Sequence, residues 1–164
     1  AVAIRPVIRL PHPVLKRVAP EGSGEPGLFE DLIDTMYSSP ACVGLAAAQI
    51  GVSARVFVVD VTTHPKTTTC HGLIALKDPS IEYLESRVVG REGCMSVPDL
   101  TANVARAAGV VVTGTTPDGE ARKITTDGFE ARALQHEFDH LDGTLILDRV
   151  ASLATDVFRR KVYR

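Results

Sequence analysis

The chain has 164 residues, 18 of them basic and 20 acidic, which gives a formal net charge of −2. This length suffices for one domain with a substantial core, and 45% hydrophobic with 23% charged residues is typical of ordinary globular proteins. The charge balance argues against a DNA partner, and no apolar run approaches the roughly 20 residues that span a bilayer. We therefore expect one domain over residues 1–164, with neither DNA nor a membrane as its partner.

The expected compartment follows from the N-terminus and the cysteines. The first residues show neither the pattern of a secretion signal nor that of a transit peptide. Three cysteines, an odd number, suit a reducing compartment better than a disulfide framework. We expect a cytoplasmic protein, or an organellar one if a transit peptide has been removed.

Three elements are predicted in the first part of the chain. Prolines among aliphatic residues predict an extended arm or short turn over residues 5–18. Apolar residues at helical spacing predict a helix over 28–37, and the β-branched run at 55–61 predicts a strand. The polar stretch that follows the strand predicts a loop.

The second part of the chain is predicted to hold several strands and two helices. The strands are expected at 72–76, 81–89, 104–113 and 121–125. Asp127 can cap a helix that runs to Leu141, with Gly143 just past its end. A short amphipathic helix is expected over 152–164, with Leu153, Val157 and Phe158 facing inward.

The helix ending at Leu141 carries the motif that says most about function. His136 and His140 are four residues apart, so in a helix both rings lie on one face and can bind one metal ion. Glu137 follows the first histidine, giving the H-E-x-x-H arrangement of metal-dependent hydrolases. The alternative is a chance pairing, because five-residue motifs have real false positives. The chain is predicted to be an α+β fold: short, mostly antiparallel strands packed around a central metal-binding helix.

Cys94 is the candidate third ligand. It lies in Glu-Gly-Cys-Met-Ser, between two strand-like segments. A thiolate with two imidazoles makes a three-ligand site and leaves an open position for water, as a catalytic metal requires. The alternative is a small buried apolar residue, the commoner fate of a free cysteine. These residues alone leave both open.

Three segments of the chain together resemble the motifs of the peptide deformylases. The family's motifs are Gly-x-Gly-Leu-Ala-Ala-x-Gln, Glu-Gly-Cys-Leu-Ser and Gln-His-Glu-x-Asp-His-Leu. The chain has Cys-Val-Gly-Leu-Ala-Ala-Ala-Gln at 42–49, Glu-Gly-Cys-Met-Ser at 92–96 and Gln-His-Glu-Phe-Asp-His-Leu at 135–141. They occur in the family's order, and the resemblance covers nearly all of the chain.

The resemblance implies an activity and a metal. The implied activity is the hydrolytic removal of the N-formyl group from the initiator methionine of nascent polypeptides, which releases formate. It implies Cys94, His136 and His140 as the ligands of one divalent ion per chain. Fe²⁺ is expected natively, although ligand softness alone would predict zinc. Purified protein could carry Zn²⁺, Ni²⁺ or Co²⁺.

The resemblance also implies roles for further residues. Glu137 is expected to accept and return a proton, while the side chain of Gln49 and the backbone N–H of Met95 donate to the oxygen that becomes negative. The substrate backbone is expected to pair with the edge at Val43 and Gly44 like an added strand. Three further residues are expected to bind substrate: Gly93, Phe129 and Ala133. Val43 and the ring of His136 are expected to contact it as well.

Some residues receive structural interpretations, and two depart from the family's pattern. Glu92 and Asp139 are expected to pair with Arg106, and Gln135 to brace the site. Cys42 replaces the first motif glycine, and Thr101 stands where bacterial relatives often have an arginine that helps to hold substrate. The basic cluster Arg159, Arg160, Lys161 and Arg164 is a candidate for docking on the ribosome.

Two rival interpretations remain. One is a zinc peptidase built on H-E-x-x-H alone, although the sequence after the motif offers no later histidine as its third ligand. The other is a catalytically silent metal-binding homologue, which should have lost Glu137 or Gln49, and both are present. The expected partner is the N-formylmethionyl peptide, and the expected state is a monomer, with a weak dimer as the alternative.

Overall fold

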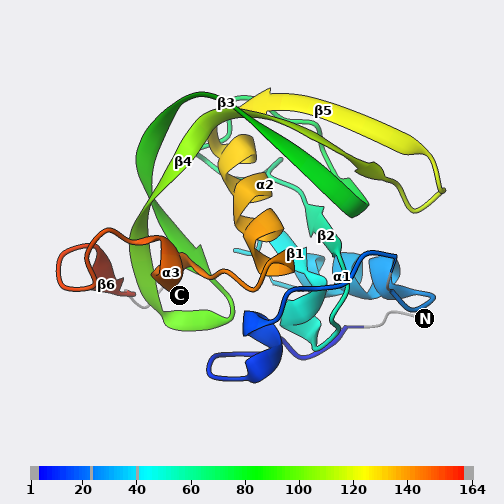
Figure 1. The fold of residues 1–164 in the computed structure, drawn as a ribbon, viewed down its shortest axis with the longest axis horizontal. Helices are drawn as coiled ribbons and strands as arrows, with labels where there is room; N and C mark the ends of the chain where they lie inside the picture. The colour runs from blue at the N-terminus through cyan, green and yellow to red at the C-terminus, as the bar shows by residue number, and fades with distance from the viewer. Residues whose placement is uncertain (1–3, 23, 40, 161–164) are drawn as a thin grey trace.

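The computed structural model describes residues 4–22, 24–39 and 41–160. In chain order its elements are η1 (Pro13–Lys16), α1 (Leu28–Tyr37), β1 (Gly44–Ala46), η2 (Ala47–Ile50), β2 (Val56–Val59), β3 (Ile74–Cys94), β4 (Val97–Thr115), β5 (Ala121–Asp127), α2 (Gly128–Leu141), α3 (Ile146–Arg149) and β6 (Val157–Arg159). The strands pair antiparallel in the order β1-β2-β3-β4-β5, and β6 pairs with β4. Helix α2 lies in the middle of the strands (Figure 1). The predicted antiparallel α+β fold is confirmed.

The β3–β4 hairpin is longer than the short strands predicted. Strand β3 has 21 residues and β4 has 19. Strand β3 includes residues 74–76 of the strand expected at 72–76 and all of the one expected at 81–89. The register shifts between Lys77 and Ser80, where Asp78 has a φ of 48° and Pro79 lacks an N–H. The proline therefore marks a bulge within one strand and not a loop between two.

Helix α2 begins and ends where the sequence predicts. It follows Asp127 and ends at Leu141, and Gly143 has a φ of 70° just beyond it. The carboxylate of Asp127 makes no capping hydrogen bond, because it accepts instead from the hydroxyl of Thr69. Ala131, Leu134 and Leu141 are buried in the core shared with the sheet. Burial of this face fixes which way the rest of the helix points.

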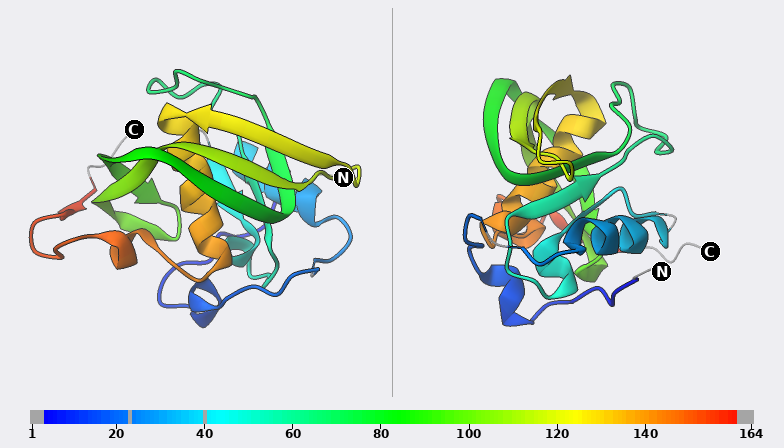
Figure 2. Two further views of the ribbon diagram at one scale, coloured as in Figure 1. Left: turned by 45° about the horizontal axis from the view of Figure 1, so that its top comes forward. Right: turned by 90° about the vertical axis from the view of Figure 1, so that its right-hand side faces the viewer.

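Helix α1 covers the other part of the core, next to β1 and β2. Its buried residues Leu28, Leu32 and Met36 repeat every four positions, which is the expected spacing for one helical face. They pack with residues of β1, η2 and β2 in one hydrophobic cluster. Figure 2 gives two further views of α1, which contacts β1 and β2. The strand β1 is thereby held between α1 and α2 in the fold.

The predicted C-terminal helix over 152–164 is wrong for the residues that the structure describes. Residues 157–159 form β6, which pairs with Leu100, Thr101 and Ala102 of β4. Leu153, which was expected to face inward, is 69% exposed. The free edge of β4 offers backbone hydrogen bonds that override the helical spacing of a short segment. Residues 161–164 of the predicted helix lie outside the described residues.

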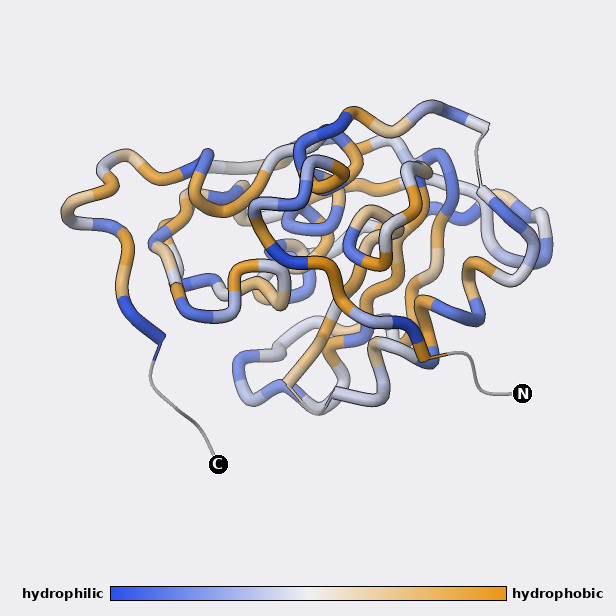
Figure 3. Tube along the Cα trace, turned by 90° about the horizontal axis from the view of Figure 1, so that it is seen from below, coloured by the Kyte–Doolittle hydropathy of each residue, from blue (hydrophilic) through white to orange (hydrophobic). Residues whose placement is uncertain are grey.

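Hydrophobic and hydrophilic residues follow one another at short intervals along the chain (Figure 3). Within the described residues, no helix combines the length and apolar character needed to cross a membrane.

Candidate metal centre

Three donor atoms meet between the turn of the β3–β4 hairpin and α2. Cys94 ends β3, while His136 and His140 lie one turn apart on α2, and one donor atom from each lies within 4.8 Å of the others. Cys94 Sγ is 3.5 Å from His140 Nε2, and the two imidazole centroids are 5.2 Å apart. A tetrahedral ion at about 2.3 Å from sulfur and about 2.1 Å from nitrogen would separate these donors by about 3.6 Å. The three side chains therefore fit a single metal ion.

The electrostatics of Cys94 also fit a cation at this point. Burial opposes ionisation of the thiol, but the neighbouring rings of His140 and His136 outweigh it and lower the pKa of Cys94 well below its ordinary value. A thiolate is the form of cysteine that binds metal. A cation held next to the sulfur would stabilise that thiolate further.

Glu92 orients His136. Its Oε1 lies 2.9 Å from His136 Nδ1, so this nitrogen carries the proton and Nε2 is left to face Cys94. Burial disfavours the Glu92 carboxylate, yet hydrogen bonds from Arg106 and His136 hold its pKa well below the ordinary range. The carboxylate thus stays ionised and fixes the ring.

Glu92 belongs to a buried ion-pair network that joins the hairpin to α2. Arg106 of β4 donates to both oxygens of Glu92, at 2.8 and 2.9 Å, and to Asp139 of α2 at 2.5 Å. Arg132 donates to Glu92 at 2.7 Å, and Arg149 makes two hydrogen bonds to Asp139. The predicted pairing of Glu92 and Asp139 with Arg106 is confirmed. The network holds the thiol-bearing and imidazole-bearing elements together.

Gln135 fixes α2 to β4 through two hydrogen bonds to one strand residue. Its Oε1 accepts from the N–H of Ala107 and its Nε2 donates to the carbonyl of the same residue, both at 2.9 Å. The side chain therefore replaces a neighbouring strand along this part of β4. The expectation that Gln135 braces the site is confirmed.

Glu137 lies beside the donor atoms with part of its carboxylate unpaired. Among the described residues, its buried Oε1 has no hydrogen-bond partner. Burial raises the pKa of this carboxyl above its ordinary value, against the lowering effect of His136 and His140. Its Oε2 lies against Gly44, where an added Cβ would be only 2.6 Å away. A carboxylate with a raised pKa and a free oxygen can accept a proton.

Gln49 is oriented by its neighbours so that its amide N–H₂ faces the site. Its Oε1 accepts from the Ala46 N–H at 3.0 Å, and its Nε2 lies 3.2 Å from Ser96 Oγ and 3.6 Å from Cys94 Sγ. Met95, next to the thiol, lines the same cavity. Both predicted donor residues therefore lie at the metal centre. The contribution of Ser96 was missed, although it is the last residue of the second motif.

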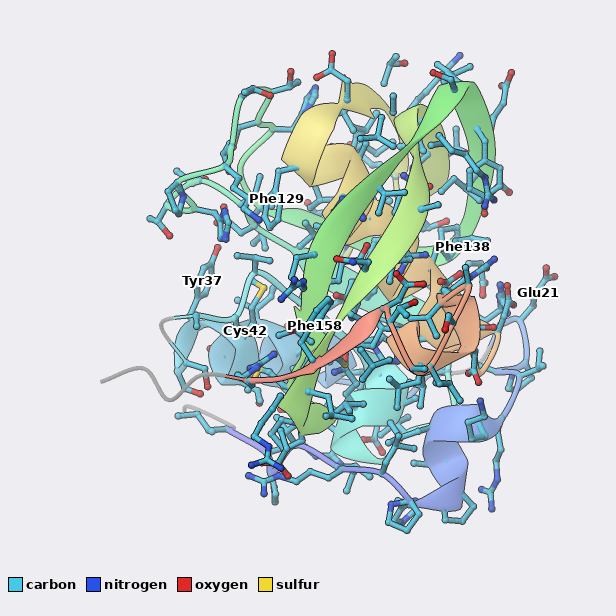
Figure 4. The ribbon with its side chains drawn as sticks, turned by 90° about the vertical axis from the view of Figure 1, so that its left-hand side faces the viewer. Glu21, Tyr37, Cys42, Phe129, Phe138 and Phe158 are labelled. Carbon is cyan, nitrogen blue, oxygen red and sulfur yellow. The ribbon has the colours of Figure 1, made fainter. Side chains whose placement is uncertain are left out.

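A cavity of about 500 Å³ opens in front of these side chains. Its lining includes every predicted substrate-binding residue, namely Val43, Gly44, Gly93, Phe129, Ala133 and the ring of His136. Phe129 stacks on His64, with ring centroids 4.0 Å apart and planes within 10°. Figure 4 shows Phe129 and Cys42 on the side of the molecule that also carries Phe158. Phe129 is thus a cavity wall and not only a core residue.

The structure adds cavity residues that sequence reasoning missed. His64 comes from the polar loop after β2, where nothing in the sequence marked it. Besides Arg132, which pairs with Glu92, four basic residues line the cavity, namely Arg9, Lys66, Arg91 and Arg160. They come from four separate segments of the chain, so no local pattern could have grouped them.

Cys42 lies at the cavity with its thiol turned toward β1. Its Sγ is 3.2 Å from the carbonyl oxygen of Gly44, to which the thiol donates. Burial raises the pKa of Cys42 to about 12, and the negative charge of Glu137 adds to this effect. The thiol therefore stays protonated and behaves as a small apolar residue at this position.

A ligand set of one thiol and two imidazoles, with a free carboxylate beside it and a cavity in front, is that of a hydrolytic metal site. Comparison with known proteins narrows this class. The polypeptide deformylase family profile matches residues 4–156. The chain belongs to the peptide deformylases, a family of hydrolases.

Relatives support the assignment over the full chain. The peptide deformylase of Syntrophobacter fumaroxidans is 40% identical, with 98% of this chain and 94% of the relative covered. That of Thermodesulfovibrio yellowstonii is 39% identical, with 98% and 97% covered. A crystal structure of a class I type b peptide deformylase from Acinetobacter baumannii with Met-Ala-Ser bound has a TM-score of 0.83 at 32% identity, with 92% of this chain and all of that chain covered (100%). The rival zinc peptidase is not favoured.

Proposed function

We propose that the chain removes the N-formyl group from the N-terminal formylmethionine of nascent polypeptides, with one divalent ion held by Cys94, His136 and His140. The observation that carries the proposal is the convergence of these donors within 4.8 Å, beside a carboxylate that has an unpaired oxygen. When bound, the ion would supply Lewis acidity that makes water a nucleophile near neutral pH.

Glu137 would move the proton. Its buried carboxylate is adjacent to both histidines, and its raised pKa brings it closer to the pH at which the reaction runs. It would accept a proton from the attacking water and return it to the amine of the departing peptide. The close approach of Gly44 holds the carboxylate in this position.

Gln49 and Met95 would stabilise the negative charge that develops on the formyl oxygen. The Gln49 amide is already fixed by Ala46 and Ser96, so its N–H₂ needs little rearrangement. The backbone N–H of Met95 is the second proposed donor. Loss of one such donor typically reduces kcat by about 100- to 1,000-fold.

The cavity explains how a formylmethionyl peptide would be selected. Val43, Phe129, Ala133 and the His136 ring offer apolar surface for the methionine side chain. The edge of β1 at Val43 and Gly44 is proposed to pair with the substrate backbone. The Met-Ala-Ser peptide bound to the Acinetobacter baumannii relative supports a peptide as the occupant here.

The metal and the setting are part of the proposal. We propose Fe²⁺ as the native ion, with Zn²⁺, Ni²⁺ or Co²⁺ as substitutes in purified protein. Because the proposed substrate is a nascent chain, we propose the bacterial cytoplasm as the setting, or an organelle if a transit peptide has been removed. The proposed state is a monomer, with a weak dimer as the alternative. Docking on the ribosome through Arg159 and Arg160 is a separate proposal, and Lys161 and Arg164 of that cluster lie outside the described residues.

The test is formate release from formyl-Met-Ala-Ser under anaerobic conditions, with metal analysis on the same sample. We expect formate in proportion to metal content, and no cleavage of a blocked internal peptide. Cleavage of the internal peptide without formate release would favour the zinc peptidase. Bound metal with neither reaction would favour the silent homologue.

A further inference from the structure

Four basic side chains line the mouth of the cavity without an acidic partner. We call Arg9, Lys66, Arg91 and Arg160 the cationic rim. None of them forms an ion pair with a described residue, whereas six other described Lys and Arg side chains do. The two carboxylates that line the cavity are Glu92, already paired with Arg106 and Arg132, and the buried Glu137. The cavity mouth therefore has an uncompensated positive charge in a chain whose net charge is −2.

Arg160 is placed at the cavity by strand pairing. Gly93 of β3 pairs with Thr101 of β4, and Thr101 pairs with Phe158 of β6. Arg160 lies two residues beyond Phe158, on the same face, and its N–H bonds the carbonyl of Asp99 at 2.8 Å. Its guanidinium fills the space that a side chain at Gly93 would occupy. The guanidinium of Arg160 therefore lies beside Gly93, the residue that precedes Cys94.

Arg91 comes to the same face from β3. It lies two residues before Gly93, and its guanidinium is 3.6 Å from the centroid of the Phe158 ring. Its Nε donates to Asn103 at 3.1 Å and its Nη1 to Thr101 at 3.4 Å. These contacts hold the guanidinium in place without neutralising it.

We infer that the cationic rim recognises a carboxylate on the peptide, about three residues along from the formyl group. The inference rests on the proposed function, because the peptide enters with its methionine in the apolar part of the cavity. An extended strand advances about 3.3 Å per residue, so residues beyond the methionine pass out of the cavity along the rim. The carboxylate can be the side chain of an acidic third residue or the free C-terminus of a tripeptide. Arg91 donates to Thr101, and both Arg160 and Thr101 lie against the space beside Gly93, so the two guanidinium groups reach the same part of the cavity.

The test compares peptides that differ only in one charge. The substrates are formyl-Met-Ala-Asp-amide and formyl-Met-Ala-Asn-amide for the side chain, and formyl-Met-Ala-Ser with its amide for the C-terminus. We expect kcat/KM to be about threefold to tenfold higher for the charged member, mainly through a lower KM. The preference should fall as salt is raised, because the rim is open to solvent.

Variants identify the residues responsible. Arg160→Gln and Arg91→Gln should each bring the ratio of kcat/KM for Asp- over Asn-amide closer to 1, with kcat on the Asn-amide nearly unchanged. Arg159→Gln is the matched control, since Arg159 is exposed and does not line the cavity. Equal kcat/KM for charged and uncharged peptides would overturn the inference, as would an unchanged ratio in both variants.

Binding separates this inference from the proposed function. Calorimetry of Met-Ala-Asp-amide and Met-Ala-Asn-amide with the metal-loaded protein requires no turnover. Tighter binding of the Asp peptide that is lost in Arg160→Gln supports recognition of the carboxylate, even if no formate is released. Formate release with equal binding of both peptides overturns the inference and leaves the proposed function intact.

Discussion

Glu137 and Gly44 lie in direct contact, so that a Cβ on Gly44 would be 2.6 Å from Oε2 and 3.0 Å from two carbons of the same side chain. The backbone of β1 and the proposed base on α2 are therefore closely packed. Gly44 does not have a positive φ, so its backbone conformation does not require glycine. Glycine is required here because a side chain would collide with Glu137.

Gly44→Ala should displace the Glu137 carboxylate and leave the donor cluster in place. We expect kcat for formate release to fall about 100-fold, since a shift of about 1 Å in a catalytic group can have this effect. Steady-state kinetics and metal analysis on the same sample check the result. Full activity in the alanine variant would show that the position of Glu137 is not critical.

Glu137→Gln should keep the shape of the side chain and remove the base. Metal content is expected to be unchanged, while kcat falls by a factor of roughly 100 to 10,000. Metal analysis and a formate assay are the measurements. A glutamine variant that turns over at the normal rate would rule out Glu137 as the proton acceptor.

Cys94→Ser should abolish metal binding and thereby activity. The hydroxyl replaces the thiolate whose pKa is lowered by the two histidines, and it remains protonated at neutral pH. We expect the purified variant to contain little metal and release no formate, while circular dichroism shows a folded protein. Cys70→Ser, at an exposed cysteine, is the control and should retain both.

Glu92→Gln should weaken both stability and metal binding. It leaves the buried Arg106 without part of its counter-charge, at a cost of about 3 kcal/mol in unfolding free energy. It also loosens His136, for which about a 10- to 100-fold loss of metal affinity is expected. Urea unfolding and competitive metal titration measure the two effects.

The same pair of proteins tests the pH dependence. The folded-state pKa of Glu92 is depressed below its ordinary value of 4.5, so its stabilising contribution is complete above pH 4.5. As the pH falls below 4.5 toward the folded-state pKa, that contribution is lost. The difference in unfolding free energy between the native protein and Glu92→Gln should therefore be constant near neutrality and shrink in acid. A constant difference down to strongly acid pH would contradict the assignment.

Cys42 should resist alkylation although it lines the cavity. Because burial raises its pKa to about 12, almost no thiolate is present at pH 8. Iodoacetamide at that pH should label the exposed Cys70 and spare Cys42, as read by mass spectrometry. In urea both should be labelled. Rapid labelling of Cys42 in the folded protein would show that its thiol is ionised.

The sequence predicted the elements whose patterns are local. The spacing of Leu28, Leu32 and Met36 predicted α1, and the flanking Asp127 and Gly143 predicted the limits of α2. The prediction from sequence failed for segments whose structure depends on pairing with a strand distant in the chain. The spacing of Leu153, Val157 and Phe158 predicted a helix, but residues 157–159 form a strand because they pair with the edge of β4. The two strands expected at 72–76 and 81–89 belong to one strand, because pairing with β4 continues across a bulge at Pro79.

The candidate site was likewise predictable only where its residues belong to local motifs. The relative position of the two histidines follows from their spacing on one helix. Cys94 was assigned to the same site through the family resemblance, and in the structure the three side chains lie together. The unpaired cations at the cavity mouth could not have been foreseen, because Arg9, Lys66, Arg91 and Arg160 meet only after four segments have folded. His64 was missed for the same reason.

The order in which the chain is synthesised gives the tight turn between β3 and β4 a particular consequence. Cys94 pairs with Val97 at that turn, so the hairpin can form from the turn outward while the polypeptide is still being synthesised. The imidazoles follow about 40 residues later, on a helix that must dock before they reach the sulfur. A newly made molecule therefore carries a lone thiol in the interval, and acquires its full affinity for a cation only in the last stage of folding.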